Sequence, residues 1–179
     1  MTVRTLDHCY VISGGPGSGK STLLAELAAM GYTCLPEGAR SIIAAHASIG
    51  SDVRQDLRLF GELTLSWDMR SWAEAAAMAG PVFSDRGLGE LVTFFESQVG
   101  DVPAHVWRAA REWRYNSTVF VAPFWAEIYR QDEERVQSAE FAASVYAPTV
   151  EIYRRLDYDV VELPRVSPRE RAEFVLTHL

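Results

Sequence analysis

The sequence predicts a single α/β domain over residues 1–179, in which a five-stranded parallel sheet lies between two layers of helices. Three observations predict this fold. Short apolar segments alternate with longer segments of helical periodicity, a glycine-rich loop joins the first strand to the first helix, and no linker or repeat divides the chain. Hydrophobic residues make up 48% of the chain and charged residues 23%, a balance typical of a folded domain.

The first predicted unit is a strand, a loop and a helix. Cys9–Ser13 (CYVIS) has the composition of a buried strand, and Ser21–Met30 (STLLAELAAM) has that of a helix ending at Gly31. Between them, residues 14–21 (GGPGSGKS) match the phosphate-binding pattern G-x-x-x-x-G-K-[ST]. The three parts stand in the order that a phosphate-binding loop requires.

This loop predicts a site for ATP. Its glycines let successive amide groups converge on an anion, and the following helix adds the positive end of its dipole. Lys20 is the only lysine of the chain and would reach the β- and γ-phosphates, while the hydroxyl of Ser21 would bind Mg²⁺. We expect the nucleotide to contact Gly15, Pro16, Gly17, Ser18, Gly19, Lys20, Ser21 and Thr22.

The rest of the chain continues the alternation. Further strands are predicted at Tyr32–Pro36, Val82–Ser84, Thr118–Ala122 and Val160–Leu163. Further helices are predicted at Ala39–Ala47, Asp52–Ala79, Leu88–Ser97, Ala104–Tyr115 and Ser138–Leu156, with a last one from Ser167. Ser51 or Asp52 can cap the long helix, and Gly80 with Pro81 ends it. Ser167 and Glu170 form a capping box around Pro168 in the last helix.

Ligands of such folds gather at the carboxyl edge of the sheet, so polar residues that follow strands are candidate site residues. Asp85 and Arg86 follow the third strand. Asp85 can help to hold Mg²⁺, or it can cap the next helix. Arg86 can clamp a phosphate, or it can pair with Asp85.

Glu37 follows the second strand. A carboxylate there can accept the proton of a hydroxyl while that hydroxyl receives a phosphoryl group. The alternative is an acid placed at a helix N-terminus by the dipole, with Arg40 on the solvated face. The residues alone leave both interpretations open.

The segments GGPGSGKS, PEGAR, SDRGLGE, APFWAEIYRQDEERVQ and YDVVELPRVSPRER together resemble the small P-loop ATPase family labelled AAA domain. That group includes the ribosylnicotinamide-kinase domain of bacterial NAD regulators. It is more distantly similar to nucleoside and nucleotide monophosphate kinases, and the similarity covers essentially the whole chain. It implies the strand order 2-3-1-4-5 of a P-loop NTPase, an acid facing the acceptor at Glu37, and an Asp-Arg pair at Asp85 and Arg86.

The resemblance also implies a lid at about residues 125–138, carrying Arg130 and Arg135. Two arginines that swing over the γ-phosphate would stabilise the charge of the transition state and exclude water. The alternative is a solvated helix in which Arg130 pairs with Glu134. With the resemblance, we favour the lid.

Missing features of the chain argue against several classes of function. The guanine-specific NKxD motif of small GTPases would require a second lysine besides Lys20. The chain is also shorter than a full AAA+ module with its helical lid domain. A net charge of −7 argues against nucleic-acid binding, and the absence of a membrane span or signal peptide favours a cytoplasmic location.

The expected function is ATP- and Mg²⁺-dependent phosphoryl transfer to a small-molecule acceptor. The expected catalytic residues are Lys20, Glu37, Asp85, Arg86, Arg130 and Arg135, with Ser21 and Asp85 holding the metal. A rival hypothesis is a regulatory NTPase whose slow hydrolysis switches binding to a protein or lipid partner. The sequence predicts neither the acceptor nor the oligomeric state.

Overall fold

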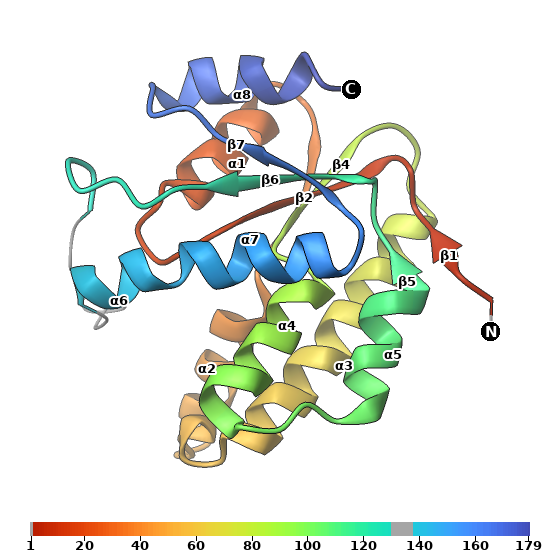
Figure 1. Cartoon of the computed structure of the whole chain (residues 1–179), viewed down its shortest axis with the longest axis vertical. Coiled ribbons are helices and arrows are strands. Elements are labelled where there is room, and N and C mark those ends of the chain that lie inside the picture. The colour runs from red at the N-terminus through yellow and green to blue at the C-terminus, as the bar shows by residue number, and fades with distance from the viewer. Residues whose placement is uncertain (1, 130–137) are drawn as a thin grey trace.

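The fold, a computed structural model that describes residues 2–129 and 138–179, is built on a central parallel sheet (Figure 1). Its five strands lie in the order β3-β4-β2-β6-β7, and every neighbouring pair is parallel. Counted along the chain, these five strands have the expected order 2-3-1-4-5. Their bounds are β2 Cys9–Gly14, β3 Thr33–Leu35, β4 Val82–Asp85, β6 Thr118–Ala122 and β7 Asp159–Glu162.

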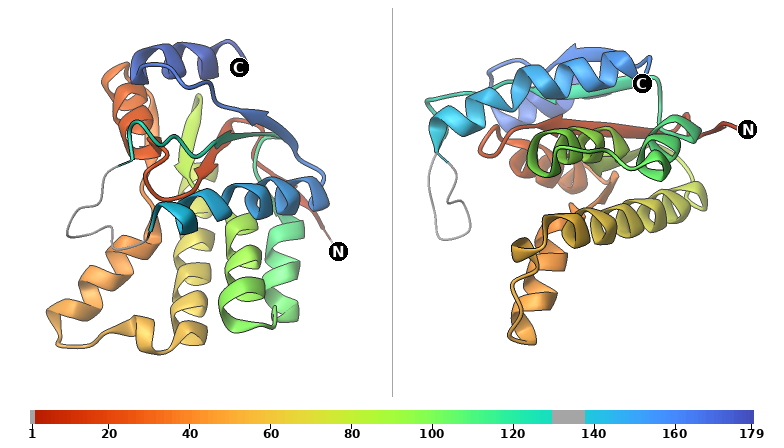
Figure 2. Two further views of the ribbon diagram at one scale, coloured as in Figure 1. Left: turned by 60° about the vertical axis from the view of Figure 1, so that its left-hand side comes forward. Right: turned by 60° about the horizontal axis from the view of Figure 1, so that its bottom comes forward.

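Helices cover both faces of this sheet, as Figures 1 and 2 show. One face carries α1 (Lys20–Ala29) and α8 (Pro168–Leu176), which pack against each other. The other face carries α3 (Leu57–Ala76), α4 (Leu88–Phe94), α5 (Ala104–Glu112) and α7 (Tyr146–Arg155). Alternate residues of β2 enter the two cores, so that Val11 packs on one side and Ile12 on the other. Both are fully buried, as strands of a doubly covered parallel sheet are.

A second, two-stranded sheet was not predicted. It pairs β1 (Arg4–Thr5) with β5 (Trp113–Arg114), in the stretch where the sequence predicted that the helix from Ala104 continues to Tyr115. The carbonyl of Arg114 accepts hydrogen bonds from the amide of Leu6 at 3.0 Å and from the indole of Trp72 at 3.0 Å. These tertiary contacts outweigh the helical propensity of the segment and end α5 at Glu112.

Three predicted helices are shorter or divided in the structure. The segment predicted as one helix over 52–79 forms a 3₁₀ turn, η1 (Val53–Gln55), and then α3. Asp56 caps α3 by accepting from the amide of Leu59 at 2.9 Å, while Asp52 caps η1 instead. The segment 88–97 forms α4 and a π turn, η2 (Phe95–Val99), and the segment 138–156 divides into α6 (Ala139–Ser144) and α7.

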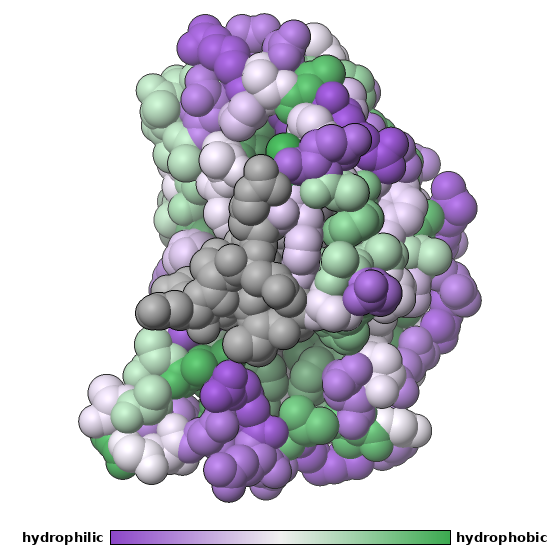
Figure 3. Space-filling view, turned by 90° about the vertical axis from the view of Figure 1, so that its left-hand side faces the viewer, coloured by the Kyte–Doolittle hydropathy of each residue, from purple (hydrophilic) through white to green (hydrophobic). Residues whose placement is uncertain are grey.

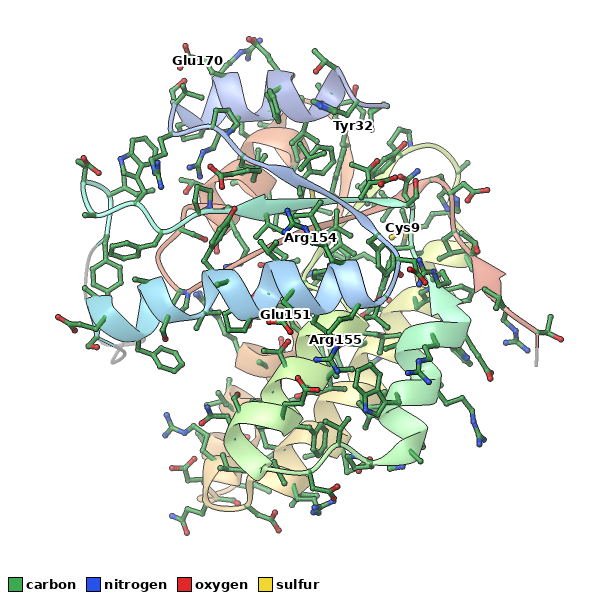
Figure 4. All side chains as sticks on the ribbon, in the orientation of Figure 1. Cys9, Tyr32, Glu151, Arg154, Arg155 and Glu170 are labelled. Carbon is green, nitrogen blue, oxygen red and sulfur yellow. The ribbon has the colours of Figure 1, made fainter. Side chains whose placement is uncertain are left out.

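The predicted capping box of α8 is confirmed. Glu170 accepts from the amide of Ser167 at 3.0 Å, and the hydroxyl of Ser167 accepts from the amide of Glu170 at 3.3 Å. Figure 4 labels Glu170 at the start of this helix. The remaining helix, α2 (Gly38–Ser48), follows β3 directly and brings Glu37 to the carboxyl edge of the sheet. In the described parts of the chain, no helix combines the length and apolar character needed to cross a membrane.

Candidate active site

The glycine-rich loop leaves β2 at Gly14 and enters α1 at Lys20. Gly14 has φ +133°, and a Cβ there would lie 2.4 Å from the carbonyl oxygen of Ala122 on the neighbouring strand β6. Gly19, the residue before α1, has φ +86°. Only glycine adopts these conformations and close approaches at little cost, which fixes the shape of the loop.

Lys20 is buried and bound by the loop itself. Its ammonium donates hydrogen bonds to the carbonyls of Gly14 at 2.7 Å and Gly15 at 2.9 Å. Burial, reinforced by the charge of Arg86, lowers the pKa of Lys20 to about 8 although nearby carboxylates act to raise it. Phosphate oxygens can replace these carbonyls as acceptors, because the ammonium already lies within the loop that would cradle them.

Asp85 ends β4 beside Ile12 of β2, close to the loop. Its Oδ1 is buried and has no hydrogen-bond partner among the described residues, and burial is the main cause that raises the pKa of this carboxyl. The residue before α4 is Gly87, whose amide donates to Glu90 at 3.1 Å. The structure therefore does not place Asp85 as the helix cap.

The residues present fit a magnesium ion bound with the nucleotide. An unpartnered carboxylate oxygen at Asp85 and an exposed hydroxyl at Ser21 are both hard oxygen ligands. In residues 2–129 and 138–179 no cluster of three or more acidic, histidine or cysteine side chains could hold a metal. An ion here would thus take its other ligands from phosphate and water, as Mg²⁺ does in nucleotide sites.

Arg86 pairs with Glu37. Of the two roles that the sequence left open for it, pairing with Asp85 is therefore wrong. Its Nε donates to Oε1 of Glu37 at 2.8 Å, and its Nη1 donates to the carbonyl of Gly14 at 3.3 Å. The backbone of Arg86 has φ +73°, a strained conformation for a residue with a side chain. This turn directs the guanidinium back across the edge of the sheet and joins β3, β4 and the loop.

Glu37 lies at the start of α2 but does not cap it with its side chain. Its side chain is only 17% exposed, and Arg40 lies 3.7 Å from its second oxygen. Burial acts to raise the pKa of Glu37, but Arg86, Lys20 and Arg40 together outweigh it and leave the pKa below its usual value. The carboxylate is therefore ionised at neutral pH and available to accept a proton.

Two acids near this pair were not singled out from the sequence. Glu90 of α4 accepts from the amide of Gly87 and from the hydroxyl of Tyr153, while its other oxygen is buried and has no partner in residues 2–129 and 138–179. Asp68 of α3 has its pKa raised to about 8, first by burial and then by Glu90 and Glu37. The spacing within SDRGLGE could have indicated Glu90, whereas Asp68 lacks any local motif.

A cavity of about 1070 Å³ is lined both by the loop and by Glu37, Arg86 and Glu90. Its nucleotide end includes residues 16–22, and its far end is lined by the apolar side chains of Ile43, Leu57, Phe60 and Phe94. The polar side chains of Arg54 and Gln98 also line it. Figure 3 shows this side of the molecule, toward which β6 points in Figure 1, with apolar and hydrophilic surface side by side.

The predicted lid arginines cannot be placed in this arrangement, because Arg130 and Arg135 lie outside the described residues. The segment that leads to them does contribute to the cavity, through Trp125 and Ile128. Arg171 of α8 also lines the cavity, and the sequence had not singled it out. Its only sequence signal is its place in the first turns of the last helix.

Comparison with known proteins supports the fold. The sequence profile of the family described as AAA domain matches residues 9–171, which is most of the chain. No curated protein matches the chain.

Solved structures of kinases share the fold at low sequence identity. One is the deoxyadenosine kinase of M. mycoides with products dCMP and dCDP bound, at 15% identity and a TM-score of 0.68, covering 95% of this chain and 97% of that one. The same kinase with bound dATP gives a TM-score of 0.67, 15% identity and 96% and 98% coverage. Shikimate kinase from Acinetobacter baumannii in complex with shikimate has 16% identity and a TM-score of 0.53, covering 97% and 92%.

Proposed function

The chain belongs to the AAA domain family, and we propose that it is a kinase that transfers the γ-phosphoryl group of ATP to a hydroxyl of a small-molecule acceptor. One observation carries this proposal. A single cavity joins the phosphate-binding loop to the Glu37–Arg86 pair and continues into an apolar pocket. A donor and an acceptor can therefore meet in one cavity, as phosphoryl transfer requires.

On the donor side, the loop amides and Lys20 would hold the triphosphate. Ser21 and Asp85 would hold Mg²⁺, which when bound neutralises phosphate charge as transfer proceeds. The guanidinium of Arg86 lies between Glu37 and the loop carbonyl of Gly14. It can thus orient Glu37 and stabilise charge on the transferring group at the same time.

On the acceptor side, Glu37 would orient the acceptor hydroxyl and take its proton. The acceptor oxygen forms a bond to the γ-phosphorus, the bond from that phosphorus to the bridging oxygen breaks, and ADP leaves. The proton passes to Glu37. A carboxylate of lowered pKa is a weak base, but it suffices where the transition state is loose and the hydroxyl becomes acidic late.

The lining of the far pocket supports an acceptor with an apolar, planar part. Phe60 and Phe94 meet edge to face at 5.6 Å there, and Gln98 offers an amide for hydrogen bonding nearby. A nucleoside or a compact ring alcohol has this combination of a flat or apolar body and a hydroxyl. The solved kinases of similar fold are consistent with an acceptor of this class. At their low sequence identity, however, the similarity shows only a shared fold.

The test of this function is the substitution Glu37→Gln, which keeps the size of the side chain and removes its basicity. We expect acceptor-dependent transfer to fall by about 10²- to 10⁴-fold, while the dissociation constant of ATP changes little. The matched control is Glu173→Gln, an exposed acid on α8. An unchanged transfer rate in Glu37→Gln would remove this residue from the mechanism.

A regulatory NTPase remains the second candidate, and it is favoured by the way the loop holds its own lysine. The carbonyls of Gly14 and Gly15 accept hydrogen bonds from the ammonium of Lys20, so a phosphate would have to replace these acceptors. A protein of this kind would release phosphate slowly and bind a partner in a nucleotide-dependent way. It would show no acceptor-dependent transfer.

A further inference from the structure

Glu90 of α4 has one carboxylate oxygen bound by the protein and one that is not. Its Oε2 accepts hydrogen bonds from the amide of Gly87 at 3.1 Å and from the hydroxyl of Tyr153. Its Oε1 is buried, and no group of the described ranges 2–129 and 138–179 forms a hydrogen bond with it. Burying a carboxylate oxygen without a donor is costly, so a donor supplied by a ligand would be favourable there.

A capping role explains only part of this arrangement. Glu90 is the third residue of α4, and its bond to the amide of Gly87 caps the start of that helix. The cap needs one oxygen, yet the hydroxyl of Tyr153 on α7 gives the same oxygen a second donor. The ring of Tyr153 lies so close to α4 that a Cβ at Gly89 would be 2.8 Å from it. Donors from two separate segments therefore fix the orientation of the carboxylate, as a preorganised binding group requires.

Within the described part of the chain, Glu90 forms no ion pair with a basic side chain. The charges of Lys20 and Arg86 act on it only through space, because the hydrogen bonds of these two cations go to loop carbonyls and to Glu37. Burial first, and then the charges of Glu90 and Glu37, raise the pKa of Asp68 to about 8. Negative charge thus prevails around these acids, and a cation next to Oε1 would be stabilised.

The next turn of α4 supplies further groups that suit a cation. Glu90, Thr93 and Phe94 all line the cavity, and their spacing of three and four residues makes them neighbours on one face of the helix. Oγ1 of Thr93 is also buried, without a hydrogen-bond partner among the described residues. The ring of Phe94 meets that of Phe60 edge to face at 5.6 Å. A carboxylate oxygen, a hydroxyl and an aromatic ring together are the groups that bind an ammonium ion.

We propose that the acceptor is an amino alcohol, whose primary ammonium group donates hydrogen bonds to Oε1 of Glu90 and Oγ1 of Thr93 and lies against the ring of Phe94. Its hydroxyl would then be the group that faces Glu37 and receives the phosphoryl group. Glu90 determines specificity here and takes no part in the proton transfer. The inference rests on the proposed function, because it assigns the pocket beyond Glu37 to the acceptor.

The experiment compares the binding of two small probes, benzylammonium and benzyl alcohol, to the protein saturated with ADP and Mg²⁺. Both probes carry the aromatic ring, but only benzylammonium carries the cation. By ligand-observed NMR at pH 7 we expect benzylammonium to bind about tenfold more tightly. Glu90→Gln should remove this preference and Thr93→Val should reduce it, while the affinity for benzyl alcohol changes little. Glu96→Gln is the matched control, since Glu96 follows on the same helical run and pairs with Arg155 at 3.0 Å.

Equal affinity for the two probes in the unaltered protein would overturn the proposal, and this outcome depends on no variant. A preference for benzylammonium that survives unchanged in Glu90→Gln would overturn it as well. Transfer from labelled ATP separates this inference from the proposed function. If matched diols are phosphorylated as efficiently as the corresponding amino alcohols, only this inference falls. If the ammonium preference is present but label reaches no acceptor, the proposed function falls and Glu90 remains part of a cation site.

Discussion

At the residue scale, the candidate site contains buried polar atoms, and some of them lack a hydrogen-bond partner among the described residues. Nε of Arg86 donates a hydrogen bond to Oε1 of Glu37 at 2.8 Å, and this ion pair helps to keep the glutamate ionised. In the described part of the chain, Oδ1 of Asp85 and Nη2 of Arg171 are both buried without a hydrogen-bond partner. Buried polar atoms without hydrogen-bond partners are rare in folded proteins. Their presence near both ends of the loop therefore favours ligand binding there.

Asp85→Asn tests the metal at this scale. The amide is a weaker ligand than the carboxylate, so the Mg²⁺ concentration needed for half-maximal ATP turnover should rise by about tenfold or more. Titration of turnover with Mg²⁺ measures the shift. Asp101→Asn changes an exposed acid paired with Arg58 and serves as the control. Identical Mg²⁺ curves for Asp85→Asn and the unaltered protein would contradict the assignment.

Residues that carry a recognisable pattern could be predicted from the sequence, and residues placed by tertiary contacts could not. The loop, Glu37 and the Asp85-Arg86 pair all follow strands, and the parallel topology brings them together. Arg86 turns toward Glu37 because its backbone takes a positive φ, which no sequence pattern revealed. Arg171 lies far along the chain from Ser18, so only the fold shows that they touch.

At the element scale, α3 brings Asp68 toward the acidic group around Glu37 and Glu90. The native state raises the pKa of Asp68 to about 8, so folding favours its protonated form. The stability that this provides is present below the pKa of the unfolded chain, about 4, and is lost as pH rises through about 8.

Asp68→Asn removes that titration. We expect the variant to be more stable than the unaltered protein by about 1 to 3 kcal/mol at pH 8 and equally stable at pH 4. Urea unfolding at both pH values measures this. Glu74→Gln, an exposed acid near the end of the same helix, should show no such pH-dependent gain. A uniform effect at both pH values would mean that the charge of Asp68 is not involved.

The elements themselves were predicted where local signals are strong. Ser167, Pro168 and Glu170 begin α8 as expected, because a capping box is a local device. The division of the long predicted helix at Asp56 was missed, since a second aspartate lies close by at Asp52 and either can cap. The β1–β5 pair was missed because its strands come from distant segments and depend on Trp72.

At the scale of the whole molecule, the phosphate-binding loop lies at the carboxyl edge of the sheet, and one cavity is lined by this loop and by the apolar side chains of α2, α3 and α4. Ligand binding there should stabilise the complete fold, because the loop, α2 and α8 all contribute to its lining. ATP at about 100 times its dissociation constant should raise the free energy of unfolding by about 2.7 kcal/mol.

Lys20→Ala should abolish most of this stabilisation, since the ammonium of the only lysine reaches back into the loop. Thermal unfolding with and without ATP measures it. Arg70→Ala, which removes an exposed cation of α3, should retain the full shift. An ATP-dependent shift that survives in Lys20→Ala would place the nucleotide elsewhere.

The measurement that tests the central claim most directly is the fate of the γ-phosphoryl group of labelled ATP. The unaltered protein is incubated with Mg²⁺, labelled ATP and a panel of nucleosides, nucleotides and small alcohols, and the products are separated. We predict label on one class of acceptor at a rate well above the rate of phosphate release without acceptor. Label found only in inorganic phosphate, together with nucleotide-dependent binding to a partner, would contradict the kinase and favour the regulatory NTPase.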